Sequence, residues 1–101
     1  MIKDIVKSEL VALTCEVMRT INVPVNSFKV EGNLISGNIL TYDKRFRLKF
    51  KVSDLFYTVS VNDEATLSLN DYKEIRRLNH DKLVECIALA VNLQHEREET
   101  P

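Results

Sequence analysis

The sequence predicts a single α+β domain in which two helical segments, one near each end of the chain, cover one face of an antiparallel β-meander. Three observations predict this fold. Residues 45–52, RFRLKFKV, alternate strictly between basic and apolar side chains, as a strand with one buried face does. Apolar residues recur at helical spacing near both ends of the chain. The 101 residues suffice for one modest core but not for two.

Residues 2–21 are expected to form the first helix. Their apolar side chains recur every three or four positions, and Pro24 makes continuation of the helix improbable. The apolar arc is widened by Val11, Cys15 and Met18. A wide arc has two explanations, which the sequence leaves open: deep burial under neighbouring elements, or a contact surface through which two copies of the chain form a homodimer.

Strands are expected next, because short turns divide the middle of the chain into apolar segments. Two-residue turns at Gly32–Asn33, Asp43–Lys44 and Ser53–Asp54 bring the apolar side chains of neighbouring strands to one face. A slip of one residue would turn a strand's apolar side chains to solvent, so this agreement supports the register. We expect a four-stranded antiparallel meander, with strands at about residues 26–31, 34–42, 45–52 and 55–61.

The predicted pairing gives Gly37 a cross-strand partner and allows a fifth strand. Gly37 lies opposite Phe50 in this register, and the ring is expected to cover the space that the missing side chain leaves. A three-residue loop after Val61 would pair Val61 with Ala65 and add a fifth strand at residues 65–69. The sequence leaves the choice between four and five strands open.

The last third of the chain is expected to form two helices and a frayed polar tail, at residues 71–78, 81–96 and 97–101. In a straight helix Asn79 and Lys82 would fall inside the apolar stripe. The sequence therefore predicts a kink or break near residues 79–81.

Both helical segments are expected on one side of the sheet, because only they offer apolar surface to cover its apolar face. The other face is then exposed, and the basic side of residues 45–52 lies at its centre. None of the predicted cross-strand neighbours of these cations is an acid. We therefore expect a partner-binding face made by Arg45, Arg47, Lys49 and Lys51, with Leu40, Tyr42 and Phe56 at its margins.

Basic residues cluster although the net charge is −1, since residues 44–51 hold five of the fourteen. Cations on the solvent face of a strand are ordinary, but four in a row on a central strand, with aromatic neighbours, suit a binding surface. An acidic protein surface is the favoured partner, because the net charge gives no global attraction for nucleic acid. Nucleic acid is the alternative, with phosphates along the cations and bases stacked on Tyr42 and Phe56.

The sequence contains no catalytic signature. His80 and His95 each lack a second His or Cys at the spacing of a zinc site. Cys15 and Cys86 lie on apolar helix faces and are expected to be small core residues. We therefore expect a non-catalytic adaptor, inhibitor or accessory protein that uses neither a metal nor a cofactor.

A cytoplasmic location is expected, because the cysteines show no paired spacing and no signal-peptide pattern precedes them. Charged residues interrupt residues 2–21, and no apolar run approaches the roughly 18 residues that a membrane span requires. The sequence therefore predicts no membrane partner.

Overall fold

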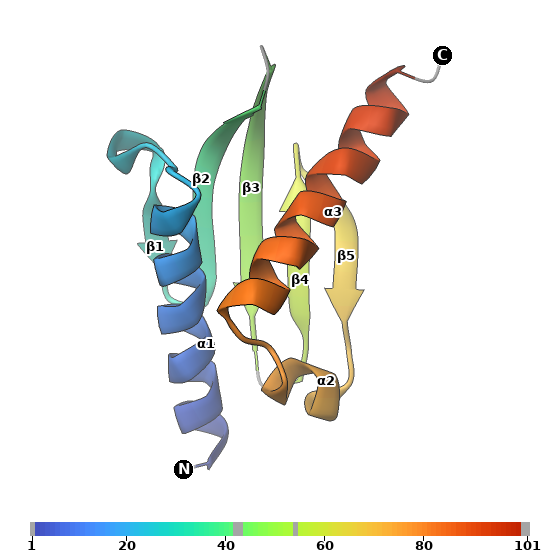
Figure 1. The fold of residues 1–101 in the computed structure, drawn as a ribbon. Coiled ribbons are helices and arrows are strands. Elements are labelled where there is room, and N and C mark those ends of the chain that lie inside the picture. The colour runs from blue at the N-terminus through green and yellow to red at the C-terminus, as the bar shows by residue number, and fades with distance from the viewer. Residues whose placement is uncertain (1, 42–43, 54, 100–101) are drawn as a thin grey trace.

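A five-stranded antiparallel sheet forms one layer of the fold and helices form the other (Figure 1). The computed structural model describes residues 2–41, 44–53 and 55–99. Each strand pairs with the next one in the chain: β1 (Lys29–Glu31), β2 (Leu34–Thr41), β3 (Lys44–Val52), β4 (Tyr57–Val61) and β5 (Glu64–Leu69). The helices are α1 (Ile2–Thr20), the 3-10 helix η1 (Val25–Ser27), α2 (Tyr72–Arg76) and α3 (His80–Glu99). The predicted fold class is confirmed, with the fifth strand present.

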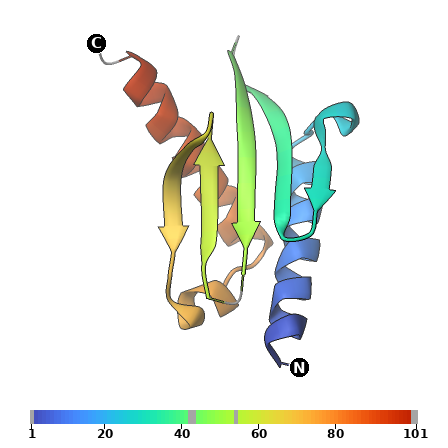
Figure 2. The same ribbon diagram turned by 180° about the vertical axis from the view of Figure 1, so that it is seen from behind.

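The two long helices, α1 and α3, lie on one side of the sheet, and Figure 2 shows the strands from the other side. The core fills the space between the two layers, and its largest fully buried side chains include Tyr57, Phe46 and Phe50. This arrangement confirms that both helices cover one face. Among the described residues, no helix is long and apolar enough to cross a membrane.

The strand register keeps the predicted faces but differs in its pairing. The first hairpin is as predicted, with Val30 opposite Ile35. Between β2 and β3, however, Gly37 pairs with Leu48 rather than with Phe50, a difference of two residues. A shift of two leaves every side chain on its face, because the side-chain period of a strand is two.

A second shift of two residues occurs between β3 and β4. Val52 pairs with Tyr57 instead of Leu55, so β4 starts at residue 57 and not at 55. The amide of Ser53 donates to the carbonyl of Phe56 at 2.9 Å and closes the connection. Leu55 and Phe56 therefore belong to a loop, not to the strand that the sequence predicted.

β5 pairs with β4 as predicted at Tyr57–Leu69 and Val59–Leu67, and an irregularity follows at Val59/Ser60. Beyond it Val61 pairs with Glu64 rather than with Ala65, so the predicted three-residue loop is wrong. The turn consists of Asn62 and Asp63, whose φ angles are 52° and 69°. Positive φ at both central residues is the conformation that matches the twist of a tight hairpin.

The helical break lies at residues 77–79 and overlaps the predicted range of 79–81 at Asn79. Asp71 caps α2 by accepting a hydrogen bond from the amide of Lys73 at 2.8 Å. The side chain of Asn79 accepts one from the amide of Lys82 at 2.9 Å and starts α3. α3 continues to Glu99, so residues 97–99 are helical and not frayed, whereas residues 100–101 lie outside the described part of the chain.

Gly37 lets the end of α1 approach the sheet closely. A Cβ atom at Gly37 would lie 2.6 Å from Cγ1 of Val23 and 2.8 Å from Cε of Met18. These two side chains fill the space that the sequence assigned to Phe50.

Met18 is itself fully buried, so it cannot contribute to the homodimer surface predicted with Val11 and Cys15. Val11 and Cys15 are partly buried and pack against the core, so for these two residues a homodimer surface stays a prediction.

One buried hydrogen bond connects the two layers. The hydroxyl of Thr14 donates to the carbonyl of Leu10 at 2.8 Å and lies 2.7 Å from the hydroxyl of Tyr57. The hydrogen between the two hydroxyls therefore comes from Tyr57. Burial raises the pKa of Tyr57 well above its ordinary value, which keeps the phenol neutral and able to donate.

We predict that Gly37→Ala lowers the free energy of unfolding by about 1–3 kcal/mol, the usual cost of overpacking. Met18 can move its terminal methyl, but the β-branched Val23 is stiffer. Urea denaturation measures the change. Gly32→Ala is a comparison variant without overpacking, because nothing lies within 4 Å of a Cβ there. Its φ of 64° adds backbone strain, so a loss of stability in this variant has a different cause. Normal stability of Gly37→Ala would contradict the packing described here.

We also predict that Thr14→Val destabilises more than Tyr57→Phe. The first substitution leaves the buried Tyr57 hydroxyl without its acceptor, at a cost of about 1–3 kcal/mol. The second removes the donor and leaves Thr14 bonded to Leu10, at a cost of about 0.5–1.5 kcal/mol. Chemical denaturation of both variants and of the double variant measures the coupling. Equal, additive costs would show that the hydroxyls do not interact.

Candidate functional site

The basic side of β3 lies in the middle of the uncovered face. The apolar residues Phe46, Leu48, Phe50 and Val52 are all fully buried. Arg45, Arg47 and Lys51 are exposed, and Lys49 is half-buried. The alternation that the sequence shows is therefore an alternation between core and surface.

The neighbours of these cations across the sheet are uncharged. On the β2 side they are Leu40, Asn38, Ser36 and Leu34, and on the β4 side Lys49 and Lys51 lie opposite Ser60 and Thr58. Each neighbour differs by two positions from the predicted one, yet the expectation that none is an acid holds for these pairs. Alternate residues of a strand lie roughly 7 Å apart. That spacing is within the Debye length of about 8 Å at physiological salt, so repulsion between the cations is only partly screened.

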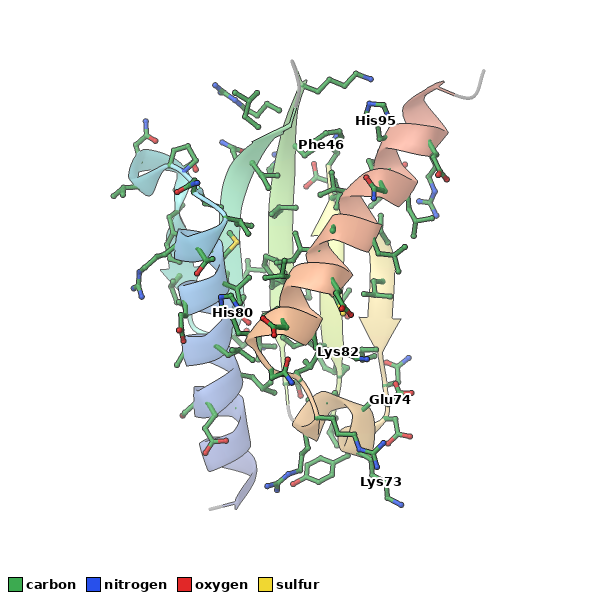
Figure 3. The ribbon with its side chains drawn as sticks, viewed as in Figure 1. Phe46, Lys73, Glu74, His80, Lys82 and His95 are labelled. Carbon is green, nitrogen blue, oxygen red and sulfur yellow. The ribbon has the colours of Figure 1, made fainter. Side chains whose placement is uncertain are left out.

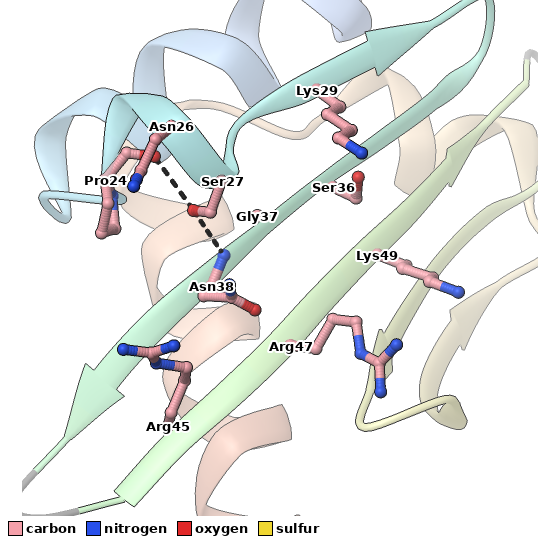
Figure 4. Close-up of a pocket in the computed structure, with 10 residues that line it drawn as sticks. All are labelled: Pro24, Asn26, Ser27, Lys29, Ser36, Gly37, Asn38, Arg45, Arg47 and Lys49. Atoms are coloured by element: carbon pink, nitrogen blue, oxygen red, sulfur yellow. Dashed lines mark hydrogen bonds between the residues drawn. The ribbon is translucent and has the colours of Figure 1, made fainter.

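A hollow of about 500 Å³, here called the basic groove, lies over β2 (Figure 4). Lys29 of β1 stands on one side of it, and three cations of β3 stand on the other. Ser36 and Asn38 supply a small, polar floor. No acid is among the residues of the described chain that line it, which are Pro24, Asn26, Ser27, Lys29, Ser36, Gly37, Asn38, Arg45, Arg47 and Lys49.

The η1 side of the basic groove is held by Ser27. Its hydroxyl donates to the carbonyl of Pro24 at 2.9 Å and accepts from the backbone amide of Asn38 at 3.1 Å (Figure 4). β1 is short and pairs only with residues 34–36 of β2. The Ser27 contact therefore continues the attachment of this segment along β2 beyond the end of β1.

An acid reaches the basic face from the β4–β5 turn. The carboxylate of Asp63 lies 2.9 Å from Nζ of Lys49 and 3.2 Å from Nη2 of Arg47. The hydrogen bond from Lys49, followed by the charge of Arg47, lowers the pKa of Asp63. A second hollow of about 370 Å³, lined by Asn38, Arg45, Arg47 and Asn62, extends from the basic groove to this turn.

The predicted site residues divide into three groups. Arg45, Arg47 and Lys49 line the basic groove together, whereas Lys51 belongs to the same face but not to the groove. Leu40 is 67% exposed and lies opposite Arg45. Phe56 precedes β4, so its predicted position beside Lys51 in the sheet is wrong. Tyr42 lies outside the described residues.

Sequence reasoning missed the site roles of Lys29 and Asp63. Nothing in a linear pattern shows that Lys29 stands across a hollow from β3. An acid in a turn, such as Asp63, is ordinary and by itself indicates no contact with a neighbouring strand. The signal for the position of Asp63 is the two-residue turn that it forms with Asn62. In the observed register this turn brings Asn62 opposite Arg47. The amide of Asn62 donates to the Arg47 carbonyl at 2.9 Å, and Oδ1 of Asn62 accepts from the Arg47 amide at 3.0 Å.

The histidines and cysteines lie apart from the basic face. His80 contacts the hydroxyl of Thr20 at 3.1 Å, and the ring of His95 lies 6.4 Å from that of Phe46 (Figure 3). Burial raises the pKa of Cys86, which disfavours its thiolate. In the described ranges, no three His, Cys, Asp or Glu side chains are grouped so that they could hold a metal ion.

Comparison with known proteins gives no match: none is found among family models, curated proteins or solved structures.

We predict that Lys49→Gln raises the pKa of Asp63 more than Arg47→Gln does, because the hydrogen bond from Lys49 is the larger cause of the lowered value. An NMR titration of the Asp63 carboxyl measures both shifts. Since folding lowers this pKa, the ion pairs stabilise the fold above the unfolded-state pKa, and that contribution is lost as the pH falls through the folded-state value. A larger shift in Arg47→Gln would contradict this assignment.

Proposed function

We propose that the chain is a non-catalytic protein-interaction module whose basic groove and adjoining basic face bind an acidic segment of a partner protein. The observation that carries the proposal is that cations stand on both sides of the basic groove and that, among the described residues, no acid lines it. A ligand in the groove would meet Lys29 on one side and Arg45, Arg47 and Lys49 on the other. Complementary charge of this kind steers association and fixes the register of a partner.

An extended polypeptide matches the spacing of the cations. Alternate residues of an extended chain lie roughly 7 Å apart, as do alternate residues of β3. A segment running along β2 with acids at alternate positions would therefore present a carboxylate near each of Arg45, Arg47 and Lys49. The Asp63 carboxylate, within 3.2 Å of both Arg47 and Lys49, illustrates that one carboxylate can bridge two of these cations. Arginine also offers two parallel donors to a carboxylate, which adds geometric specificity.

Nucleic acid remains the second candidate, and the contents of the groove argue against it. Sheet surfaces that bind single strands stack bases on aromatic side chains. None of the ten described residues that line the basic groove is aromatic, and Tyr42 lies outside the described part of the chain. Phe56 is exposed, but it lies in the loop before β4 and does not line the groove. Phosphates would still be attracted to the cations, so direct measurement has to separate the two partners.

We predict that Arg45→Glu weakens binding of poly-L-glutamate at low salt by about tenfold or more, because the reversal removes an attraction and adds a repulsion. Arg45 is suited to this test, since it is exposed and makes no ion pair with another residue of the described ranges. Lys82→Glu is the matched control. Lys82 is exposed in α3, on the helical side of the sheet, and the same charge reversal there should leave binding nearly unchanged (Figure 3).

The same titrations with a single-stranded oligonucleotide distinguish the partner classes. Equal effects of the two reversals on poly-L-glutamate would show that net charge, not this face, governs binding. Tighter binding of the oligonucleotide, falling steeply with salt and lost in Arg45→Glu, would favour nucleic acid and overturn the protein partner. Circular dichroism of each variant verifies that the fold is retained.

A further inference from the structure

The β4–β5 turn places an acid on a face that is otherwise basic at its centre. Asp63 contacts Arg47 and Lys49, while Lys29 and Arg45 make no ion pair with another residue in the described part of the chain. The four cations of the basic groove are therefore divided into two that are engaged and two that are open. A carboxylate entering the groove would find Arg47 and Lys49 already occupied.

We propose that Asp63 is a built-in competitor for the acidic partner: its carboxylate occupies Arg47 and Lys49, and the partner must displace it to bind the whole groove. This inference rests on the proposed function and concerns its regulation. It assigns to the β4–β5 turn the role of setting the affinity of the face.

The turn is built in a way that holds the carboxylate at this place. Asn62 is bonded to both the amide and the carbonyl of Arg47, at 3.0 and 2.9 Å, so the turn is tied to the residue whose side chain Asp63 contacts. Asp63 itself has a φ of 69°. Glycine or asparagine suits this backbone position better than aspartate. The chain thus keeps an acid where turn chemistry alone would favour another residue.

The exposure of the ion pairs makes displacement feasible. The side chains of Arg47 and Asp63 are 55% and 51% exposed, and that of Lys49 is 39% exposed. Solvent-exposed ion pairs of this kind are weak. A partner with several carboxylates can therefore replace Asp63, after first contacting the open cations Lys29 and Arg45. The second hollow connects Arg45 with the β4–β5 turn, since it is lined by Arg45, Arg47 and Asn62.

A purely structural role of Asp63 makes a different prediction. If the carboxylate only relieved repulsion between Arg47 and Lys49, its removal would lower stability without tightening binding. If it organised the two cations for the ligand, its removal would weaken binding. The sign of the change in affinity therefore decides among these roles.

The experiment compares Asp63→Asn with Glu64→Gln in binding of poly-L-glutamate to the full chain. Asparagine tolerates a positive φ, so the turn is preserved. Glu64→Gln removes the same charge one residue away, and the Glu64 carboxylate lies 3.2 Å from Arg97 of α3 rather than on the basic face. We expect Asp63→Asn to bind about two- to tenfold more tightly than the wild type, the worth of one or two exposed ion pairs. Glu64→Gln should stay near the wild type, and the difference should shrink as salt rises.

The outcomes separate this inference from the proposed function. Weaker binding by Asp63→Asn, or the same gain in both variants, overturns the competitor role, while loss of binding in Arg45→Glu would still support the proposed function. If neither the wild type nor Asp63→Asn binds poly-L-glutamate at low salt, the proposed function fails and the competitor role fails with it. A change of pH cannot replace the substitution, because the probe's own carboxyls, with pKa values of about 4.3, would be protonated before the lowered carboxyl of Asp63.

Discussion

Burial of the apolar side of β3 is the constraint on which the rest of the structure depends. Phe46, Leu48, Phe50 and Val52 are all fully buried beneath the two helices, in a strand flanked by β2 and β4. A slip of one residue would exchange these four side chains for three or four cations in the core. Burying unpaired charges is far more costly than any gain from a different pairing. The basic face is therefore held in place by the same interaction that holds the sheet to the helices.

The outward side of β3 then carries a row of cations, whose position is fixed by the buried side of the same strand. Uncharged neighbours on β2 and β4 avoid any further repulsion, but they do not neutralise the cations. Asp63 neutralises Arg47 and Lys49 by reaching over from the next turn, whereas Lys29 and Arg45 of the basic groove make no ion pair within the described residues. An incompletely neutralised basic face is what an acidic partner requires. If this face binds an acidic partner, as we propose, the β4–β5 turn sets the affinity, because within the described residues it supplies the acid that contacts the cations of β3.

An alternating sequence pattern limits how much of the sheet and of the basic face can be predicted. The pattern distinguishes the two faces of each strand, so the basic face and the buried row were predictable. It is unchanged by a shift of two residues, so it could not reveal that Gly37 pairs with Leu48 or that β4 starts at Tyr57. Those shifts moved Phe56 out of the sheet. The basic groove was not predictable at all, because it depends on how η1 and β1 lie against β2, a tertiary arrangement that no local pattern shows.

Gly37 connects the packing of the core to the shape of the site. One side of it faces Val23 and Met18, with no room for a Cβ, and on the other side it lines the basic groove between Ser36 and Asn38. Val23 leads directly into η1, which carries Ser27 and its bond to Asn38. Displacing Val23 would therefore move the η1 side of the groove, whereas the β3 side is held by the central strand. Lys29 and Arg45 are placed by strand pairing with β2, whereas the η1 side of the groove depends on core packing at Gly37. Core packing and the shape of the groove are therefore connected at this one position.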